Sequence, residues 1–386
     1  MLSILLMLTQ IAAAPQGAPD LGGGSDKPIV VYGFDLEASG RDLTNCIART
    51  CAPIDDVNAT LAHAENQFMS GDYAAARATV RASRKRNGEF ARSSPVAVAE
   101  LARVDARLSA LVGLSNRARI TNLDALDILN SGLTRDHPRA LRQRLQVADI
   151  FARQGRMTAA AQIYDKVAKR ARAAKLGAVE GEALFRSVAL YAAAASVAPA
   201  YQPAAKAAIK RIEDTRDPAL MPYRRGVALL KARLALLSGK HKQADAVIAR
   251  LTPAAGTPVL LYAPRIELAT VSSAWRVATD AGDKSPQWVD LQFTIAADGK
   301  VRAIELLRQS PTPITGWLDA ARKSLAARRY APLLFDTADG EEMRIERFTL
   351  VEDRISSSRS RIRGRGDARI DITDLTFVRP KTLSMK

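Results

Sequence analysis

Histidine, cysteine and aromatic residues are scarce in this chain of 386 residues, which has three histidines, two cysteines and an aromatic content of 5%. So few ligands disfavour a structural metal site, which usually takes four Cys or His side chains. The chain also lacks glycine-rich phosphate loops, a Gly-x-Ser-x-Gly turn and a His-Glu-x-x-His helix. His63, His137 and His241 lie far apart in the sequence and are expected on helices or at helix caps. We therefore predict no catalytic site, no cofactor and no metal.

Two acidic pairs and three tryptophans are of residue types that occur in functional sites, but their sequence positions favour structural roles. Asp55-Asp56 is expected at a helix start and Glu341-Glu342 in a loop, where they suit a helix dipole and solvent rather than paired-carboxylate chemistry. The tryptophans are expected to pack rather than to stack on a ligand; they are Trp275, Trp288 and Trp317.

Acidic residues are outnumbered, with 40 Asp and Glu against 57 Lys and Arg and a net charge of +17. Such a balance indicates an anionic environment or partner. The most basic stretch, Arg354–Arg369, contains Arg-Gly-Arg-Gly but no interleaved aromatic residues, which disfavours single-stranded nucleic acid. A solvated face and contact with an anionic envelope surface are the two favoured interpretations. The candidate anion contacts are Arg359, Arg361, Arg363 and Arg365.

An apolar run, Met1–Ala14, ends in small residues, as exported signals do, and is too short to cross a bilayer as a helix. It lacks the usual basic start, and a frayed apolar terminus is the alternative. Export predicts a periplasmic protein, anchored in the inner membrane if the segment is retained or longer. A Pro/Gly-rich leader follows, with a short strand expected at Ile29–Tyr32.

Cys46 and Cys51 lie close together, and an exported protein would oxidise them. Five residues turn roughly 140° around a helix, so a bridge requires the helix to break near Arg49–Thr50. Pro53 agrees with an ending there. Two free buried thiols are the alternative to this disulfide.

Residues from Ile54 to about Leu251 are dense in helical periodicity, and one pattern occurs three times. In it, an alanine is followed by a large apolar residue, then a glycine, and then a second alanine. The pattern describes a helical hairpin, in which small alanines let the helices approach and glycine ends the first helix. The glycines are Gly71, Gly155 and Gly239, each 84 residues after the one before.

This pattern resembles tetratricopeptide repeats, although the early aromatic residue and the closing proline are missing. The spacing is not a multiple of the usual 34 residues of that family. The intervening hairpins, including Val96–Leu111 and Val179–Val197, are therefore expected to be degenerate or of different length. An alanine-rich bundle without repeat geometry is the alternative.

The segment from Trp288 to Pro332 predicts a strand, a tight turn, a strand and a helix. Val289, Leu291, Phe293 and Ile295 alternate with polar residues, as in a half-buried strand. Ala297-Asp298-Gly299 is turn chemistry. The second strand is marked by Val301, Ile304 and Leu306, and the helix, Thr315–Arg329, by Leu318, Ala321 and Leu325.

The strands continue after Pro332. Met343–Glu352 is expected to form a third strand, in which the alternation slips around Phe348 and indicates a bulge or burial on two sides. Ile370–Leu375 is expected as one more strand. Extended pieces at Val259–Tyr262 and Ile266–Leu268 precede the segment.

Three motifs of this segment resemble the C-terminal domain of TonB, the periplasmic energy transducer. They are Asp298-Gly299-Lys300-Val301, Leu318-Asp319-Ala320-Ala321 and Tyr330-Ala331-Pro332. The resemblance implies a small ββαβ domain that adds strands to partner proteins through an open sheet edge. By resemblance, that edge would be the third strand, through Met343, Ile345, Arg347, Thr349 and Val351.

The chain is accordingly predicted to be an α+β multidomain protein. The expected regions are a signal-like segment (1–14), a leader with the disulfide (15–53), a tetratricopeptide-like helical domain (54–255), a TonB-like domain (258–353) and a basic tail that contains the extra strand (354–386). The arrangement resembles a family of exported proteins of sphingomonad-type bacteria.

The leading functional hypothesis is a non-enzymatic periplasmic adaptor, whose partners are proteins such as outer-membrane receptors or inner-membrane motor proteins, with no nucleic acid. An energy transducer for receptor-mediated transport is the alternative. An enzyme acting on envelope polymer is a third and disfavoured one.

Overall fold

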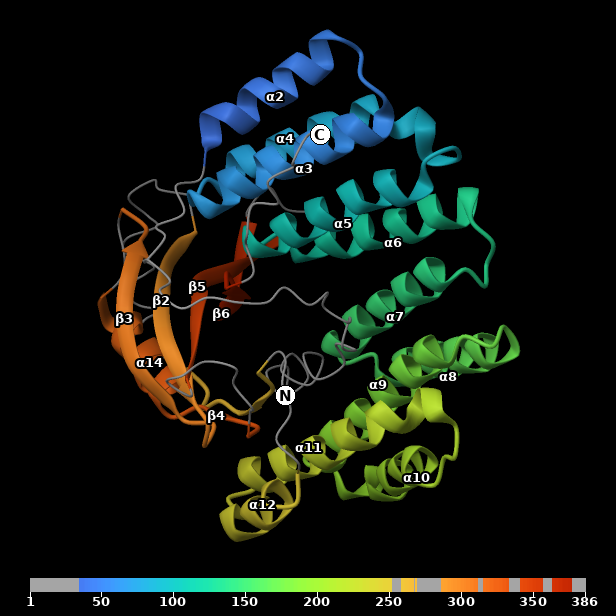
Figure 1. Ribbon diagram of the computed structural model, residues 1–386, viewed down its shortest axis with the longest axis vertical. Coiled ribbons are helices and arrows are strands. Elements are labelled where there is room, and N and C mark those ends of the chain that lie inside the picture. The colour runs from blue at the N-terminus through green and yellow to red at the C-terminus, as the bar shows by residue number, and fades with distance from the viewer. Residues whose placement is uncertain are drawn as a thin grey trace, which may run out of the picture. The chain divides into compact units, whose positions relative to one another are not determined.

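The structure, a computed structural model, describes residues 35–251, 258–266, 268, 286–311, 315–332, 341–356 and 363–376. Within these residues the protein is α+β, with helices first and an antiparallel sheet towards the C-terminus (Figure 1). The expectations for the signal-like segment, for the leader before residue 35 and for the strand at Ile29–Tyr32 lie outside the described residues. None of the helices among these residues is long and apolar enough to cross a membrane.

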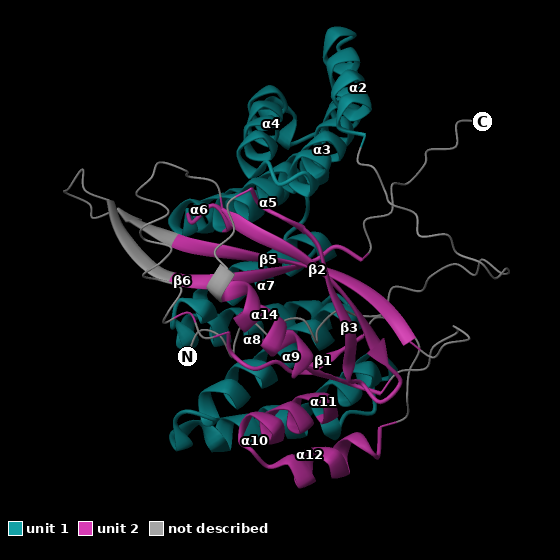
Figure 2. Cartoon of the chain, turned by 90° about the vertical axis from the view of Figure 1, so that its left-hand side faces the viewer, with its two compact units in different colours: residues 1–110, 114–227 teal, residues 111–113, 228–386 magenta. Residues whose placement is uncertain are grey.

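The chain divides into two compact units, shown in different colours in Figure 2. The first comprises Met1–Ala110 and Leu114–Val227, and the second Leu111–Gly113 and Ala228–Lys386. The third helical hairpin of the sequence pattern is thus grouped with the sheet. The expected boundary after Ala255 falls on residues 252–257, outside the described residues.

Helices that are neighbours in sequence pack side by side through most of the first unit (Figure 1). The interior is built largely from alanine, valine and leucine, as the shortage of aromatic residues predicts. The helices before the sheet, of which α12 and most of α11 belong to the second unit, are α2 (Leu36–Ala48), α3 (Pro53–Met69), α4 (Tyr73–Arg86), η2 (Gly88–Ala91), α5 (Pro95–Leu111), α6 (Ser115–Gly132), α7 (Pro138–Arg153), α8 (Met157–Ala173), α9 (Gly177–Ala195), η3 (Pro199–Tyr201), α10 (Gln202–Glu213), η4 (Pro218–Leu220), α11 (Met221–Leu237) and α12 (His241–Ile248).

Besides the end of α2, five helix ends among the described residues share one hydrogen-bonding pattern. The residue just past the helix has a positive φ, and the next amide donates to the carbonyl five residues before it at 2.8–2.9 Å. This Schellman motif satisfies carbonyls that a helix end otherwise leaves unpaired. The expectation that glycine ends the first helix of each hairpin is confirmed. The residues with positive φ are Gly71, Gly113, Gly155, Lys175 and Gly239.

The spacing of 84 residues corresponds to four helices. One period contains α3–α6, the next contains α7–α10, and α11 and α12 begin a third. The alanines of the pattern are at most 2% exposed, so small side chains do lie where the helices meet. The pattern's alanines are Ala64, Ala76, Ala148, Ala160, Ala232 and Ala244.

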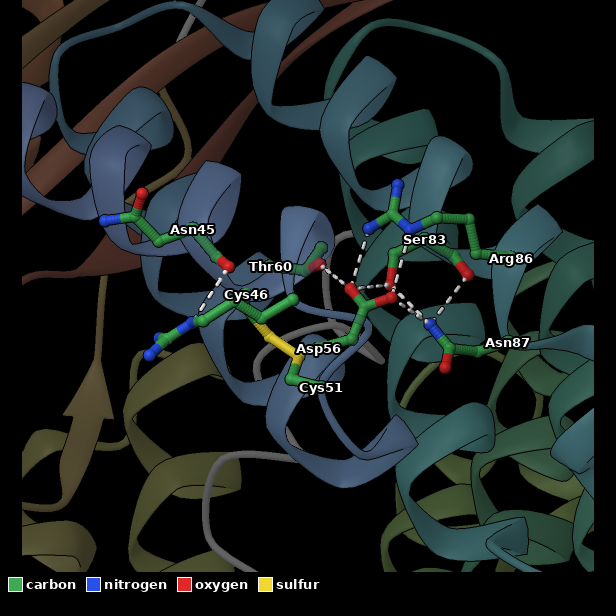
Figure 3. Close-up of a disulfide and its surroundings, with 9 residues drawn as sticks. Asn45, Cys46, Cys51, Asp56, Thr60, Ser83, Arg86 and Asn87 are labelled. Atoms are coloured by element: carbon green, nitrogen blue, oxygen red, sulfur yellow. Dashed lines mark hydrogen bonds and ion pairs between the residues drawn. A yellow bond between two sulfur atoms is a disulfide. The ribbon is translucent and has the colours of Figure 1, made fainter.

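The Cys46–Cys51 disulfide closes the end of α2 (Figure 3). Cys51 N donates to Cys46 O at 3.1 Å, and Thr50 between them has a φ of 49°. The two cysteines therefore occupy the positions that make a hydrophobic contact in other Schellman motifs. The predicted helix break at Arg49–Thr50 and the disulfide are confirmed. A covalent bond thus fixes a helix end at which a β-branched residue replaces the usual glycine.

Reduction of this disulfide is expected to lower the free energy of unfolding by about 2 kcal/mol, because a short loop is released. Thr50→Gly is expected to restore about 1 kcal/mol in the reduced protein, since glycine adopts positive φ without strain. Urea unfolding with and without dithiothreitol measures both effects. Identical midpoints for the oxidised and reduced wild-type protein would contradict the role assigned to the bridge.

A buried polar cluster joins α3 to the end of α4 (Figure 3). The Asp56 carboxylate accepts hydrogen bonds from Thr60 Oγ1 at 2.9 Å, Arg86 Nη2 at 2.7 Å and Asn87 Nδ2 at 2.8 Å, and also from Ser83 Oγ. Burial opposes ionisation, but the bonds from Arg86, Asn87 and Thr60 outweigh it and hold the pKa of Asp56 below its ordinary value. Asp56 lies in the first turn of α3, as predicted, and it also stabilises the hairpin.

The second unit contains a four-stranded antiparallel sheet, ordered β3-β2-β5-β6, and a two-stranded pair, β1-β4. The predicted helix is present but ends at Ala326 rather than Arg329, because Arg329 begins a strand. Glu341 and Glu342 begin a strand, so the prediction of a loop there is wrong. The elements are β1 (Leu260–Tyr262), β2 (Gln287–Ala296), β3 (Val301–Gln309), α14 (Thr315–Ala326), β4 (Arg329–Tyr330), β5 (Glu341–Ser356) and β6 (Arg363–Asp374).

One face of the sheet packs on α14. The alternating apolar residues of β2 are fully buried there with Trp317, so the predicted alternation is confirmed. On β5, Phe348 faces this core, while Arg347 and Thr349 are also completely buried. Burial on two sides therefore explains the slip in alternation around Phe348, where pairing with β2 and β6 is regular.

Candidate functional site

β5, the strand predicted to form an open edge, lies in the interior of the sheet between β2 and β6. β5 pairs with β2 through Glu341–Leu350 and with β6 through Glu346–Ser356. The prediction of an open edge here is wrong, because the extra strand expected at Ile370–Leu375 is present as part of β6 and pairs with β5. The five residues assigned to that edge were Met343, Ile345, Arg347, Thr349 and Val351.

Coverage by β6 is direct for most of these positions. Arg347, Thr349 and Val351 pair with Thr373, Asp371 and Arg369. Ile345 lies just before the β6 pairing, where its N–H donates to Thr376 Oγ1 at 3.0 Å and its carbonyl accepts from Leu375 N at 2.8 Å. Met343 lies before the β6 pairing, opposite Thr294 of β2, and is 54% exposed.

The edges of the described sheet are β3 and β6. β3 carries two register shifts against β2, one of which leaves Leu307 without an opposite residue. The other coincides with Ala303, whose φ is 48°. Leu307 is 43% exposed. Bulges of this kind twist an edge and limit indiscriminate pairing, and here they divide β3 into short segments of regular pairing.

The motif residues Gly299 and Tyr330 meet at one junction. Tyr330 N donates to Gly299 O at 2.8 Å, and Lys300 forms a bridge with Arg329. A Cβ on Gly299 would lie 2.2 Å from Tyr330 O, and the φ of Gly299 is +77°. Only glycine fits this turn, because both the conformation and the close backbone approach exclude a side chain. The predicted turn is confirmed.

A cavity of about 460 Å³ opens beside this junction. Its walls include Lys300 and Arg329 from the junction, and His241 and Asp245 from α12. The volume is within the range of small-molecule sites. Lys300 is held by Asp298 at 3.0 Å, and Asp245 offsets part of the remaining positive charge. The walls of the cavity therefore carry both positive and negative side chains, and these four side chains form no hydrogen bond with one another.

Two buried ion-pair groups hold the sheet, and neither was predicted. Asp290 on β2 accepts from Arg347 on β5 at 2.6 and 2.9 Å and from Arg308 on β3 at 2.7 Å. The Arg347 guanidinium also stacks 3.9 Å from the centre of the Trp288 ring. Asp290 and Arg347 are 0% exposed. The sequence does contain these opposite charges on neighbouring strands, but the pairing can be recognised only once the strand register is known.

The second group lies on the α14 face of the sheet. Arg328 donates to Glu346 Oε2 at 2.7 Å and to the Tyr330 hydroxyl at 3.1 Å. Burial raises the pKa of Tyr330 to about 12, so the phenol is neutral and can bond to the guanidinium. The group therefore ties the helix end, β4 and β5 together.

The other predicted site residues are dispersed. Arg359 and Arg361 lie outside the described residues, and Arg363 and Arg365 form backbone pairs in β6 with Ser356 and Arg354. His137 caps α7, and His63 contacts Ser39 and Gln67. Trp317 packs in the sheet core, and Trp275 is outside the described residues. Within the described part of the chain, no three His, Cys, Asp or Glu side chains converge as a metal site would require.

Comparison of the chain with protein-family models and with curated proteins finds no significant match.

Proposed function

We propose that the protein is a non-enzymatic periplasmic adaptor that binds other proteins. The observation that carries this proposal is the sheet edge β3, which ends the described sheet, has an exposed leucine and begins at the hydrogen-bonded junction of Gly299 and Tyr330. An edge strand offers unpaired main-chain groups, to which an extended segment of a partner can add.

The resemblance to the TonB C-terminal domain supports the same function. Its first and third motifs meet at Gly299 and Tyr330, and Ala321 of the second packs in the same core as Tyr330. The motif residues thus lie close together in the second unit, as the resemblance implies. The docking strand we propose is therefore β3 rather than β5, because β5 is paired on both sides.

The helical region and the disulfide support the remaining parts of the proposal. Consecutive helical hairpins of tetratricopeptide type offer extended surfaces for protein partners. A disulfide persists in an oxidising compartment such as the periplasm.

Leu307→Lys is expected to reduce partner capture strongly while changing the free energy of unfolding by less than about 1 kcal/mol. The lysine adds a charge to a partly exposed edge position, where it blocks the addition of another strand. Chemical crosslinking in the periplasm of the native bacterium, followed by affinity purification and mass spectrometry, measures the capture.

Met343→Lys is the matched control, since it places the same charge at an exposed apolar position on the central strand β5. The proposal requires that this variant retain the crosslinked partners. Equal capture by Leu307→Lys and the wild-type protein would exclude β3 as the docking strand. Loss of capture with Met343→Lys alone would place docking at the start of β5.

A further inference from the structure

Helix α4 presents three arginines on one face. Arg77, Arg81 and Arg84 are spaced four and three residues apart, which places them along one side of the helix. Arg117 lies in the first turn of α6, which begins beside Ser109: Leu114 N, at the helix cap, donates to Ser109 O, and Arg77 donates to the Ser109 hydroxyl. The positive charge of Arg117 lowers the pKa of Arg77. We call these four residues the arginine cluster.

Two members of the cluster are fixed by carboxylates from neighbouring helices. Asp105 of α5, 0% exposed, lies 3.4 Å from Arg77 Nε and 2.5 Å from Arg84 Nη1. Arg77 also donates to Ser109 Oγ at 3.0 Å, and Arg84 donates to Asp124 of α6 at 3.1 Å. These bonds orient the two guanidinium groups without any ligand.

The other two members have no such partners. Arg81 and Arg117 are exposed, and neither forms a hydrogen bond or ion pair within the described part of the chain. Burial lowers the pKa of Arg77, and the positive charges of Arg81 and Arg117 lower it further. The four arginines exceed the two carboxylates by two positive charges, which repel each other until an anion binds.

We propose that the arginine cluster is the docking site for an acidic, extended segment of a partner protein. Along α4 the arginines are separated by about 6 Å and about 4.5 Å of helix rise. Every second side chain of an extended peptide lies on one side, about 6.5–7 Å apart, so alternate carboxylates can reach successive arginines. Guanidinium groups bind carboxylates with two parallel hydrogen bonds, which favours this partner.

This inference rests on the proposed protein-binding function and adds the chemistry of the segment that the helical unit recognises. It is independent of the β3 edge, because the cluster involves only α4, α5 and α6. If crosslinking still depends on Leu307 but no acidic peptide binds the arginine cluster, this inference is refuted and the proposed function is not.

The test measures binding of the purified full chain to a fluorescent peptide of alternating glutamate and serine, by fluorescence anisotropy at low salt. We expect binding that weakens as salt rises, and no binding of the matched glutamine–serine peptide. Arg81→Glu/Arg117→Glu is expected to raise the Kd at least about tenfold. Arg81→Gln/Arg117→Gln is expected to give a smaller increase, since it removes the charges without reversing them.

Arg211→Glu/Arg216→Glu is the matched control, because it makes the same change in net charge at exposed positions on and after α10. An equal loss of binding in this control would show that only the net charge of the protein matters, and would overturn the proposal. Binding to phosphatidylglycerol vesicles but not to the acidic peptide would overturn it in favour of a membrane surface. Urea unfolding of each variant shows that the fold is retained.

Discussion

Asp290→Ala is expected to lower the free energy of unfolding by about 3–5 kcal/mol, the usual effect of removing one partner from a buried ion pair. The substitution leaves Arg347, which is 0% exposed, without the carboxylate that bonds it twice. The ring of Trp288 can offset only a small part of this loss, since a cation–π contact contributes about 0.5–2 kcal/mol. Urea unfolding followed by circular dichroism measures the change.

Arg308→Ala tests whether burial causes this effect. Arg308 bonds the same carboxylate, but its side chain is 39% exposed, so we expect a loss below about 1 kcal/mol. Asp290→Leu/Arg347→Met, which replaces the whole pair by apolar side chains, is expected to recover most of the stability. A loss for Asp290→Ala no greater than that for Arg308→Ala would show that the pair is not buried as described.

Gly299→Ala is expected to destabilise the protein by about 2–4 kcal/mol. Strain at positive φ contributes about 1 kcal/mol, and the overlap of the new Cβ with Tyr330 O, 2.2 Å away, contributes the rest. The carbonyl cannot move freely, because the adjacent Tyr330 N is bonded to Gly299 O. Thermal and urea unfolding measure the loss.

Gly155→Ala is the matched control. Gly155 has the same φ of +77°, but a Cβ there would meet nothing within 4 Å. It therefore carries the conformational strain alone, about 1 kcal/mol. Equal losses in the two variants would mean that the close approach at the turn contributes nothing to the stability of the junction.

Local features of the fold were predictable from sequence. Gly71 and Gly155 end helices because the left-handed conformation is a property of single residues. The alternation of β2 and the turn at Gly299 depend in the same way on neighbours in the chain. The break at Thr50 followed from the spacing of two cysteines.

Strand order was not predictable, because it depends on contacts between distant segments. Ile370–Leu375 is predictable as a strand, and its isoleucines pack on the sheet core as part of β6. The sequence does not show that this strand begins at Arg363 and pairs with β5, so it leaves the strand at Met343–Glu352 with an open edge. The spacing of Arg77, Arg81 and Arg84 is visible in the sequence, but the contribution of Arg117 is not.

The 84-residue spacing makes four helices the repeating length of the helical region. Deletion of α3–α6 would leave α2 followed by α7, which has the same pattern of alanine and glycine as α3. Deletion of α5 and α6 alone would instead join α4 to α7 and remove Asp105, the partner of Arg84. We therefore expect the region to tolerate the loss of four helices better than the loss of two.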